Sequence, residues 1–136
     1  MGVRRDAREA AVQYLYQREL QADESDALLA DFYKLRGLSP SARKFCEHLL
    51  KGWMEHRAEI DAVIHEHARN YEFSRLSAVD RNVLRIACQE LLFCDDIPPA
   101  VAINEAIEIA KKFSTEESGK FVNGVLDNIR KSRRNP

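Results

Sequence analysis

The sequence predicts an all-α protein of about seven helices. Hydrophobic residues recur at helical spacing along most of the 136-residue chain, and no run of alternating polarity is long enough for a convincing strand. Only five glycines and four prolines interrupt the chain, so long helices can form between them. A hydrophobic content of 45% is enough for one compact core.

The first half of the chain predicts four helices. The first covers residues 4–20, with apolar side chains on one broad arc. The second covers residues 25–36 and ends at Gly37, a residue type that commonly follows a helix C-terminus. The third covers residues 39–56 and begins with Ser-Pro, a capping residue followed by proline at the first helical position. The fourth covers residues 58–70.

Three more helices are predicted in the second half. Ser77 and Asp80 resemble a capping box that starts the fifth helix, which runs to about Cys94. The Pro-Pro pair that follows ends it, because a residue before proline avoids helical geometry. The sixth and seventh helices lie in the segment VAINEAIEIAKKFSTEESGKFVNGVLD. They are joined by a polar elbow, where Ser114 and Glu117 fit a second capping box.

The charge balance argues against a protein that coats nucleic acid non-specifically. The formal net charge is −1 and the isoelectric point is near 6.4, so any RNA site must be a local basic patch. No apolar run approaches the ~20 residues of a membrane span, and no leader opens the chain, which predicts a soluble cytoplasmic protein. Cys46, Cys88 and Cys94 form no close pair and are expected to be buried thiols.

Two segments partly match motifs for phosphate or metal binding, but neither match is complete. Gly119-Lys120 fails the phosphate-loop pattern, because Ser114 and Phe121 stand where that pattern requires Gly and Ser or Thr. His65 and His67 are two residues apart, so they cannot bind one metal ion from the same helical face. We therefore expect no enzyme activity, no cofactor and no metal.

Two groups of residues suggest an RNA surface. Arg4, Arg5 and Arg8 lie close together on the first predicted helix, where three cations oppose the helix dipole and favour an anionic ligand. The alternative is a solvated chain terminus. At the elbow, Lys120 could neutralise a phosphate while Phe121 stacks on an unpaired base. The alternative there is a core phenylalanine.

Four segments of the chain resemble the NusB family of bacterial transcription antitermination factors. They are AINEAIEIAKKF, ESGKFVNGVLD, the ARE-AVQ-LY pattern near the N-terminus and VDRNVLRIACQELLF, and they occur in the same order as in the family. The match is loose between about residues 21 and 71. The resemblance implies one domain over residues 1–136, built from two fused helical bundles with subdomains at 1–70 and 71–136.

The resemblance also implies a function. NusB-like proteins bind boxA-type single-stranded RNA in nascent ribosomal RNA together with the ribosomal protein NusE. They tether that RNA to the elongating RNA polymerase with other Nus factors. The residues expected to bind RNA are Arg4, Arg5, Arg8, Tyr16, Lys112, Glu117, Lys120, Phe121 and Asn123. Those expected to bind the protein partner are Asp80 and Glu90, on an acidic face suited to a basic ribosomal protein.

Two alternatives remain open at this point. The chain could be a helical protein–protein adaptor whose arginines do not bind RNA. It could also be an RNA-targeting module of the kind fused to ribosomal RNA cytosine methyltransferases. The sequence does not distinguish a monomer from a homodimer, because the apolar arc of the first helix suits either.

Overall fold

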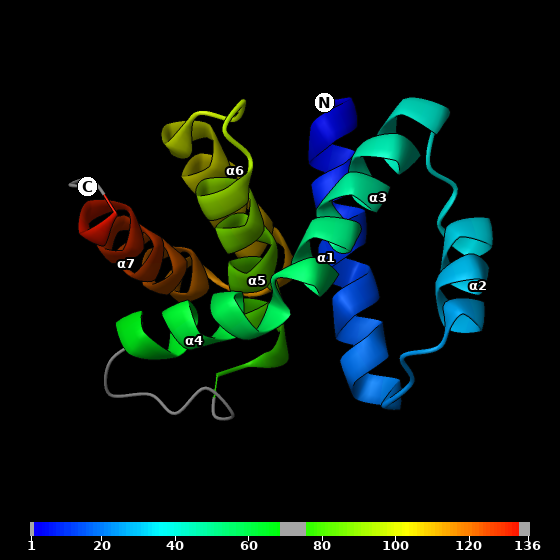
Figure 1. The fold of residues 1–136 in the computed structure, drawn as a ribbon, viewed down its shortest axis with the longest axis horizontal. Coiled ribbons are helices and arrows are strands. Elements are labelled where there is room, and N and C mark those ends of the chain that lie inside the picture. The colour runs from blue at the N-terminus through cyan, green and yellow to red at the C-terminus, as the bar shows by residue number, and fades with distance from the viewer. Residues whose placement is uncertain (1, 69–75, 134–136) are drawn as a thin grey trace.

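The computed structural model describes residues 2–68 and 76–133 and confirms the all-α prediction. The described part of the chain forms seven helices and no strand. They are α1 (Val3–Gln21), α2 (Asp26–Arg36), α3 (Pro40–Glu55), α4 (Arg57–His67), α5 (Ala78–Phe93), α6 (Pro99–Phe113) and α7 (Glu116–Ser132) (Figure 1).

Local signals for helix starts and ends operate as predicted at most positions. The hydroxyl groups of Ser25, Ser39 and Ser77 each accept a hydrogen bond from a backbone N–H in the first turn of the following helix. Gly37 follows α2 with a φ of +71°, a left-handed conformation that glycine adopts without steric cost.

The elbow between α6 and α7 differs from the prediction in its capping residue. Thr115, not Ser114, is the N-cap of α7, and its Oγ1 accepts a hydrogen bond of 3.1 Å from the Ser118 N–H. Ser114 instead follows the last turn of α6, where its hydroxyl accepts a 2.9 Å hydrogen bond from the hydroxyl of Ser118. The fourth helix ends at His67, and its expected end at residue 70 lies outside the described residues.

The hydrophobic core is continuous through both halves of the chain. One cluster of buried side chains includes residues from every helix of the structure, with α5 near the middle of the molecule (Figure 1). Trp53 and Leu126, which come from the two halves, are both at most 1% exposed. The expected division into subdomains at residue 70 stays a prediction, because it falls in a segment that the structure does not describe.

One glycine allows the close approach of α3 to α5. A Cβ atom on Gly52 would lie 2.0 Å from the Nε2 atom of Gln89. Such a distance is far inside van der Waals contact, so the packing of these two helices requires the absence of a side chain at this position.

The three cysteines are buried and unpaired, as expected. Burial raises the thiol pKa of Cys46 and Cys94 to about 11 and that of Cys88 to about 12. Among the described residues, no helix has the length and apolar character needed to cross a bilayer. No group of three potential metal ligands was found in the same residues.

Candidate RNA interface

The structure brings the first helix and the elbow region together. An ion pair between Arg5 Nε and Glu105 Oε1, at 2.5 Å, links the start of α1 to the middle of α6. Further along, Lys112 Nζ lies 3.0 Å from Glu9 Oε1. The two helices therefore run in the same direction, and the end of α6 lies beside α1. α6 therefore links α1, which carries the predicted arginines, to α7, which carries Lys120 and Phe121 and packs against α6.

Several of the predicted RNA-binding side chains are open to solvent. The side chain of Lys120 is 75% exposed, and its ammonium lies 3.6 Å from Glu117, which is itself exposed. Lys112 is 61% exposed despite its contact with Glu9. Arg4 is exposed and places its guanidinium 4.4 Å from the centre of the Phe45 ring. Asn123 is exposed on α7.

Arg8 does not lie on the surface, contrary to the expectation of a solvent-facing arginine stripe. It is 4% exposed. Its Nε and Nη2 atoms donate hydrogen bonds of 2.7 to 2.9 Å to the Glu90 carboxylate on α5. Its Nη1 atom also lies 3.6 Å from Glu105. Because α5 supplies a buried acid directly opposite α1, the guanidinium turns inward and joins the two helices.

Glu90 is likewise not part of an exposed acidic face. Its side chain is 2% exposed and its carboxylate is occupied by Arg8. Burial raises the pKa of the Glu90 carboxyl, and the hydrogen bonds from Arg8 act in the opposite direction. The acid at this position therefore organises the interior and is not available as a direct docking contact.

Arg5 occupies an intermediate position. Its side chain is 37% exposed, and its Nε and Nη2 atoms donate hydrogen bonds of 2.5 and 2.6 Å to the Glu105 carboxylate. The hydrogen bonds from Arg5 hold the pKa of Glu105 below its ordinary value. A phosphate could reach Arg5 at the surface but would compete with a carboxylate already in place.

Two aromatic side chains flank the first turn of α5. Tyr16 is 39% exposed. It lines a hollow of about 280 Å³ with Val79 and Phe113. Phe121 is half-buried and lines a second hollow, of about 300 Å³, with Asp80. Both hollows border the start of α5, and each has an apolar ring in its wall, as a site for an unpaired base requires.

The first hollow is also lined by two residues that the sequence analysis did not predict. Phe113, the last residue of the AINEAIEIAKKF segment, and Gln13 on α1 both line it. Both residues belong to segments that resemble the NusB family, and this was the only sign of them in the sequence. The sequence does not predict them as site residues, because local spacing does not show that α1 and the end of α6 meet.

Asp80, expected to contact a protein partner, lies in the same hollow as Phe121 and Glu117. Its Oδ1 atom is buried and has no hydrogen-bond partner among the residues that the structure describes. Two acids thus adjoin the Lys120–Phe121 corner. This corner is therefore electrostatically mixed, and its cationic character comes from Lys120 and, further along, Lys112.

Comparison with known proteins decides the family. The family model described as "NusB family" matches residues 5–131. The chain belongs to the NusB family. The transcription antitermination protein NusB of Geobacter sulfurreducens is 48% identical over 132 residues, which cover 95% of this chain and 94% of that protein.

Solved structures of the family share this fold. NusB of T. maritima superposes with a TM-score of 0.85 at 43% identity, over 94% of this chain and 90% of that one. The crystal structure of antitermination factors NusB and NusE in complex with dsRNA contains a chain that is 31% identical. It has a TM-score of 0.87 and covers 97% of this chain and 98% of its own. The resemblance inferred from the four sequence motifs is confirmed.

Proposed function

We propose that this protein is a non-enzymatic, cytoplasmic antitermination factor that binds boxA-type single-stranded RNA together with NusE. It holds that RNA at the elongating polymerase with other Nus factors. Relatives named transcription antitermination protein NusB match nearly the whole chain, and a similar chain forms a complex with NusE and RNA. These relationships support the class of ligand and partner.

The observation that carries the RNA proposal is the pair of aromatic hollows beside solvent-facing cations. Tyr16 and Phe121 supply ring faces at the start of α5, and stacking on a base contributes ~1–3 kcal/mol. Lys112 and Lys120 supply exposed positive charge at the end of α6 and the start of α7. Arg4 supplies exposed charge further away, at the start of α1 beside Phe45. Asn123 and Glu117 are assigned supporting polar contacts near Phe121.

Arg8 and Arg5 have different roles in this proposal from those expected from the sequence. Arg8 positions α1 against α5 and does not touch RNA, since its donors are already occupied by Glu90. Arg5 contributes at the edge of the interface, where its Glu105 pair leaves part of the guanidinium exposed. With about three phosphates neutralised, log affinity for single-stranded RNA falls against log salt with a slope near −2.

The partner surface is proposed at Asp80. It lines the Phe121 hollow at the start of α5, and its neighbour Val79 lines the Tyr16 hollow, so a basic ribosomal protein bound at Asp80 would adjoin the RNA and add contacts to it. Binding of RNA should accordingly be weak for the isolated chain and stronger with NusE.

Fluorescence anisotropy with a boxA-like RNA and a scrambled RNA, with and without NusE, tests this proposal. Lys120→Gln should weaken binding to the boxA-like RNA and reduce the magnitude of the salt slope by about 0.7. Lys131→Gln is the matched control, because Lys131 is also on α7, is 65% exposed and pairs with an acid of the same helix, Asp127. Equal and salt-insensitive binding of both RNAs would refute the proposal. A duplex of the same sequence distinguishes single-stranded from double-stranded recognition.

A helical adaptor is the second candidate function, and the internal pairing of Arg5 and Arg8 favours it. Both guanidinium groups already have carboxylate partners within the protein. The double variant Arg4→Gln/Lys120→Gln separates the two functions. If the protein binds RNA, the double variant loses affinity for RNA while it keeps NusE. If the protein is an adaptor, the unmodified protein and the double variant bind NusE equally and neither binds the boxA-like RNA.

A further inference from the structure

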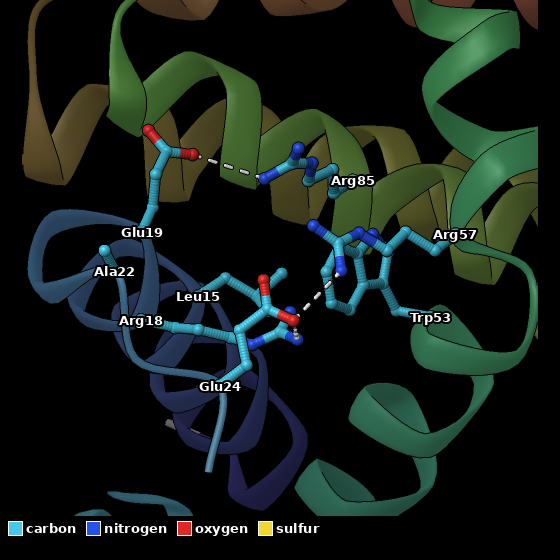
Figure 2. A pocket seen from close by; sticks show the side chains of 8 residues that line it. All are labelled: Leu15, Arg18, Glu19, Ala22, Glu24, Trp53, Arg57 and Arg85. Atoms are coloured by element: carbon cyan, nitrogen blue, oxygen red, sulfur yellow. Dashed lines mark hydrogen bonds and ion pairs between the residues drawn. The ribbon is translucent and has the colours of Figure 1, made fainter.

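A pocket lined by arginines lies between α1, α3, α4 and α5, apart from the two aromatic hollows. It has a volume of about 200 Å³. Its walls include Arg18, Glu24, Trp53, Arg57 and Arg85 (Figure 2). None of these residues lines the hollows of Tyr16 and Phe121, so the pocket is a separate feature of the surface.

Three guanidinium groups converge on one indole ring in this pocket. The central carbon atoms of Arg18, Arg57 and Arg85 lie 5.2, 5.1 and 5.4 Å from the centre of the Trp53 ring. Like charges repel, so such a cluster persists only where anions compensate it. The cations also cover the ring, which leaves it less suited to stacking on a base than to supporting charge around an anion.

One of the three cations is paired with two partly exposed acids, Asp61 and Glu19. Arg85 lies 3.0 Å from Asp61 and 3.3 Å from Glu19. Glu19 also pairs with Arg81, and that hydrogen bond holds the pKa of Glu19 below its ordinary value. Glu19 is thus shared between Arg81 and Arg85 and lines the pocket, whereas Asp61 holds Arg85 from outside the lining.

Glu24 plays a different role, because it holds the other two cations from the outside. Its Oε1 atom lies 2.9 Å from Arg18 Nη2 and 3.6 Å from Arg57 Nη1, while its side chain is 60% exposed (Figure 2). Glu24 belongs to the short link between α1 and α2. That link begins at Ala22 with a φ of +51°, a conformation that alanine rarely adopts. An exposed carboxylate on a short link is easily replaced by another anion.

Two buried donors in the pocket walls lack an acceptor. The Nε atom of Arg18 and the Nε1 atom of Trp53 are both buried and have no hydrogen-bond partner among the described residues. Trp53 is 1% exposed. Buried donors without acceptors are uncommon in folded proteins, so their occurrence in an arginine pocket points to a missing acceptor.

We propose that this arginine pocket binds a phosphate group in competition with Glu24. Guanidinium groups bind phosphate oxygens through paired hydrogen bonds, and several donors are gathered here from different helices. Once Glu24 moves away, Arg18 and Arg57 lose the carboxylate that both of them contact, so their guanidinium groups are left to an incoming anion. The phosphate can come from a small free anion or from an RNA backbone.

Calorimetric titration with inorganic phosphate, at ionic strength held constant with chloride, tests the proposal. Saturable binding is expected, and Glu24→Gln should bind phosphate about fivefold more tightly, because the competing charge is removed. Arg57→Gln should weaken binding roughly tenfold. Arg57 is 44% exposed, so this variant leaves the core unchanged. Circular dichroism verifies the fold of each variant.

Arg43→Gln is the matched control. Arg43 also lies over an aromatic ring, 4.5 Å from the centre of Tyr33, and pairs with the exposed Glu47, but it is outside the pocket. The control should bind phosphate as the unmodified protein does. Absence of saturable binding by Glu24→Gln, or equal weakening by Arg43→Gln and Arg57→Gln, would overturn the proposal.

RNA titrations of Arg57→Gln and of the unmodified protein identify the source of the phosphate. A loss of RNA affinity, together with competition by inorganic phosphate, identifies the RNA backbone as the source. Unchanged RNA affinity with loss of phosphate binding identifies a small anion. The phosphate titration does not involve RNA, so its outcome is independent of the Lys120→Gln test of the proposed function.

Discussion

The buried pair of Arg8 and Glu90 allows the sharpest test of what the first helix does. Arg8 is 4% exposed and donates three hydrogen bonds to Glu90. Arg8→Met leaves the Glu90 carboxylate buried without its cation. Removing one partner of a buried pair costs ~3–5 kcal/mol of the free energy of unfolding. For a chain of 136 residues, at about 3 °C per kcal/mol, the midpoint of thermal unfolding should fall by roughly 10–15 °C.

A double variant separates the loss of the pair from the loss of the side chain. Arg8→Met/Glu90→Met fills similar space without a buried charge, so it should recover most of the stability lost in Arg8→Met. Urea unfolding of the unmodified protein, the two single variants and the double variant measures the coupling free energy. Arg5→Met is the comparison, because its pair with Glu105 is more exposed, with the Arg5 side chain 37% open to solvent.

RNA binding by the same variants completes the test. If Arg8 acts only by positioning α1, the folded double variant should bind the boxA-like RNA within about twofold of the unmodified protein. A cost below about 1 kcal/mol for Arg8→Met would refute the reasoning, since that value is typical of a solvent-exposed pair. Full loss of RNA affinity in a stable double variant would instead show that Arg8 contacts RNA directly.

Three further predictions concern pH, thiol reactivity and packing. Arg5 lowers the pKa of Glu105, so their ion pair stabilises the folded protein above the ordinary glutamate pKa of about 4.3. This stabilisation is lost as pH falls and Glu105 becomes protonated. The stability difference between the unmodified protein and Arg5→Gln, measured in urea, should therefore shrink below about pH 4; a constant difference would contradict it. The three buried cysteines should resist a thiol reagent at about pH 8 in the native protein and react when urea unfolds it; rapid native labelling would disprove their burial. Gly52→Ala should destabilise the protein by ~1–3 kcal/mol through its clash with Gln89, whereas Gly124→Ala, with open space around it, should be neutral or stabilising in the same assay.

Secondary structure was predictable because its signals are local. Ser39 and Ser77 cap the helices that follow them, and Gly37 ends α2, all within a few residues of the pattern that predicts them. The elbow shows the limit of such signals. Ser114 and Thr115 are both suitable caps, and the choice of Thr115 depends on how far α6 extends before the chain turns.

The sequence by itself determined the helices, the family and the types of residue available for RNA binding. Only the tertiary structure decided which cations face solvent, because an ion pair depends on an acid that is distant in sequence. Arg8 meets a carboxylate 82 residues away in the sequence and Arg5 meets one 100 residues away, whereas Lys120 pairs with Glu117 in its own helix turn. The arginine pocket arises in the same way, since Arg18, Arg57 and Arg85 come from three helices and meet only when the core around Trp53 forms.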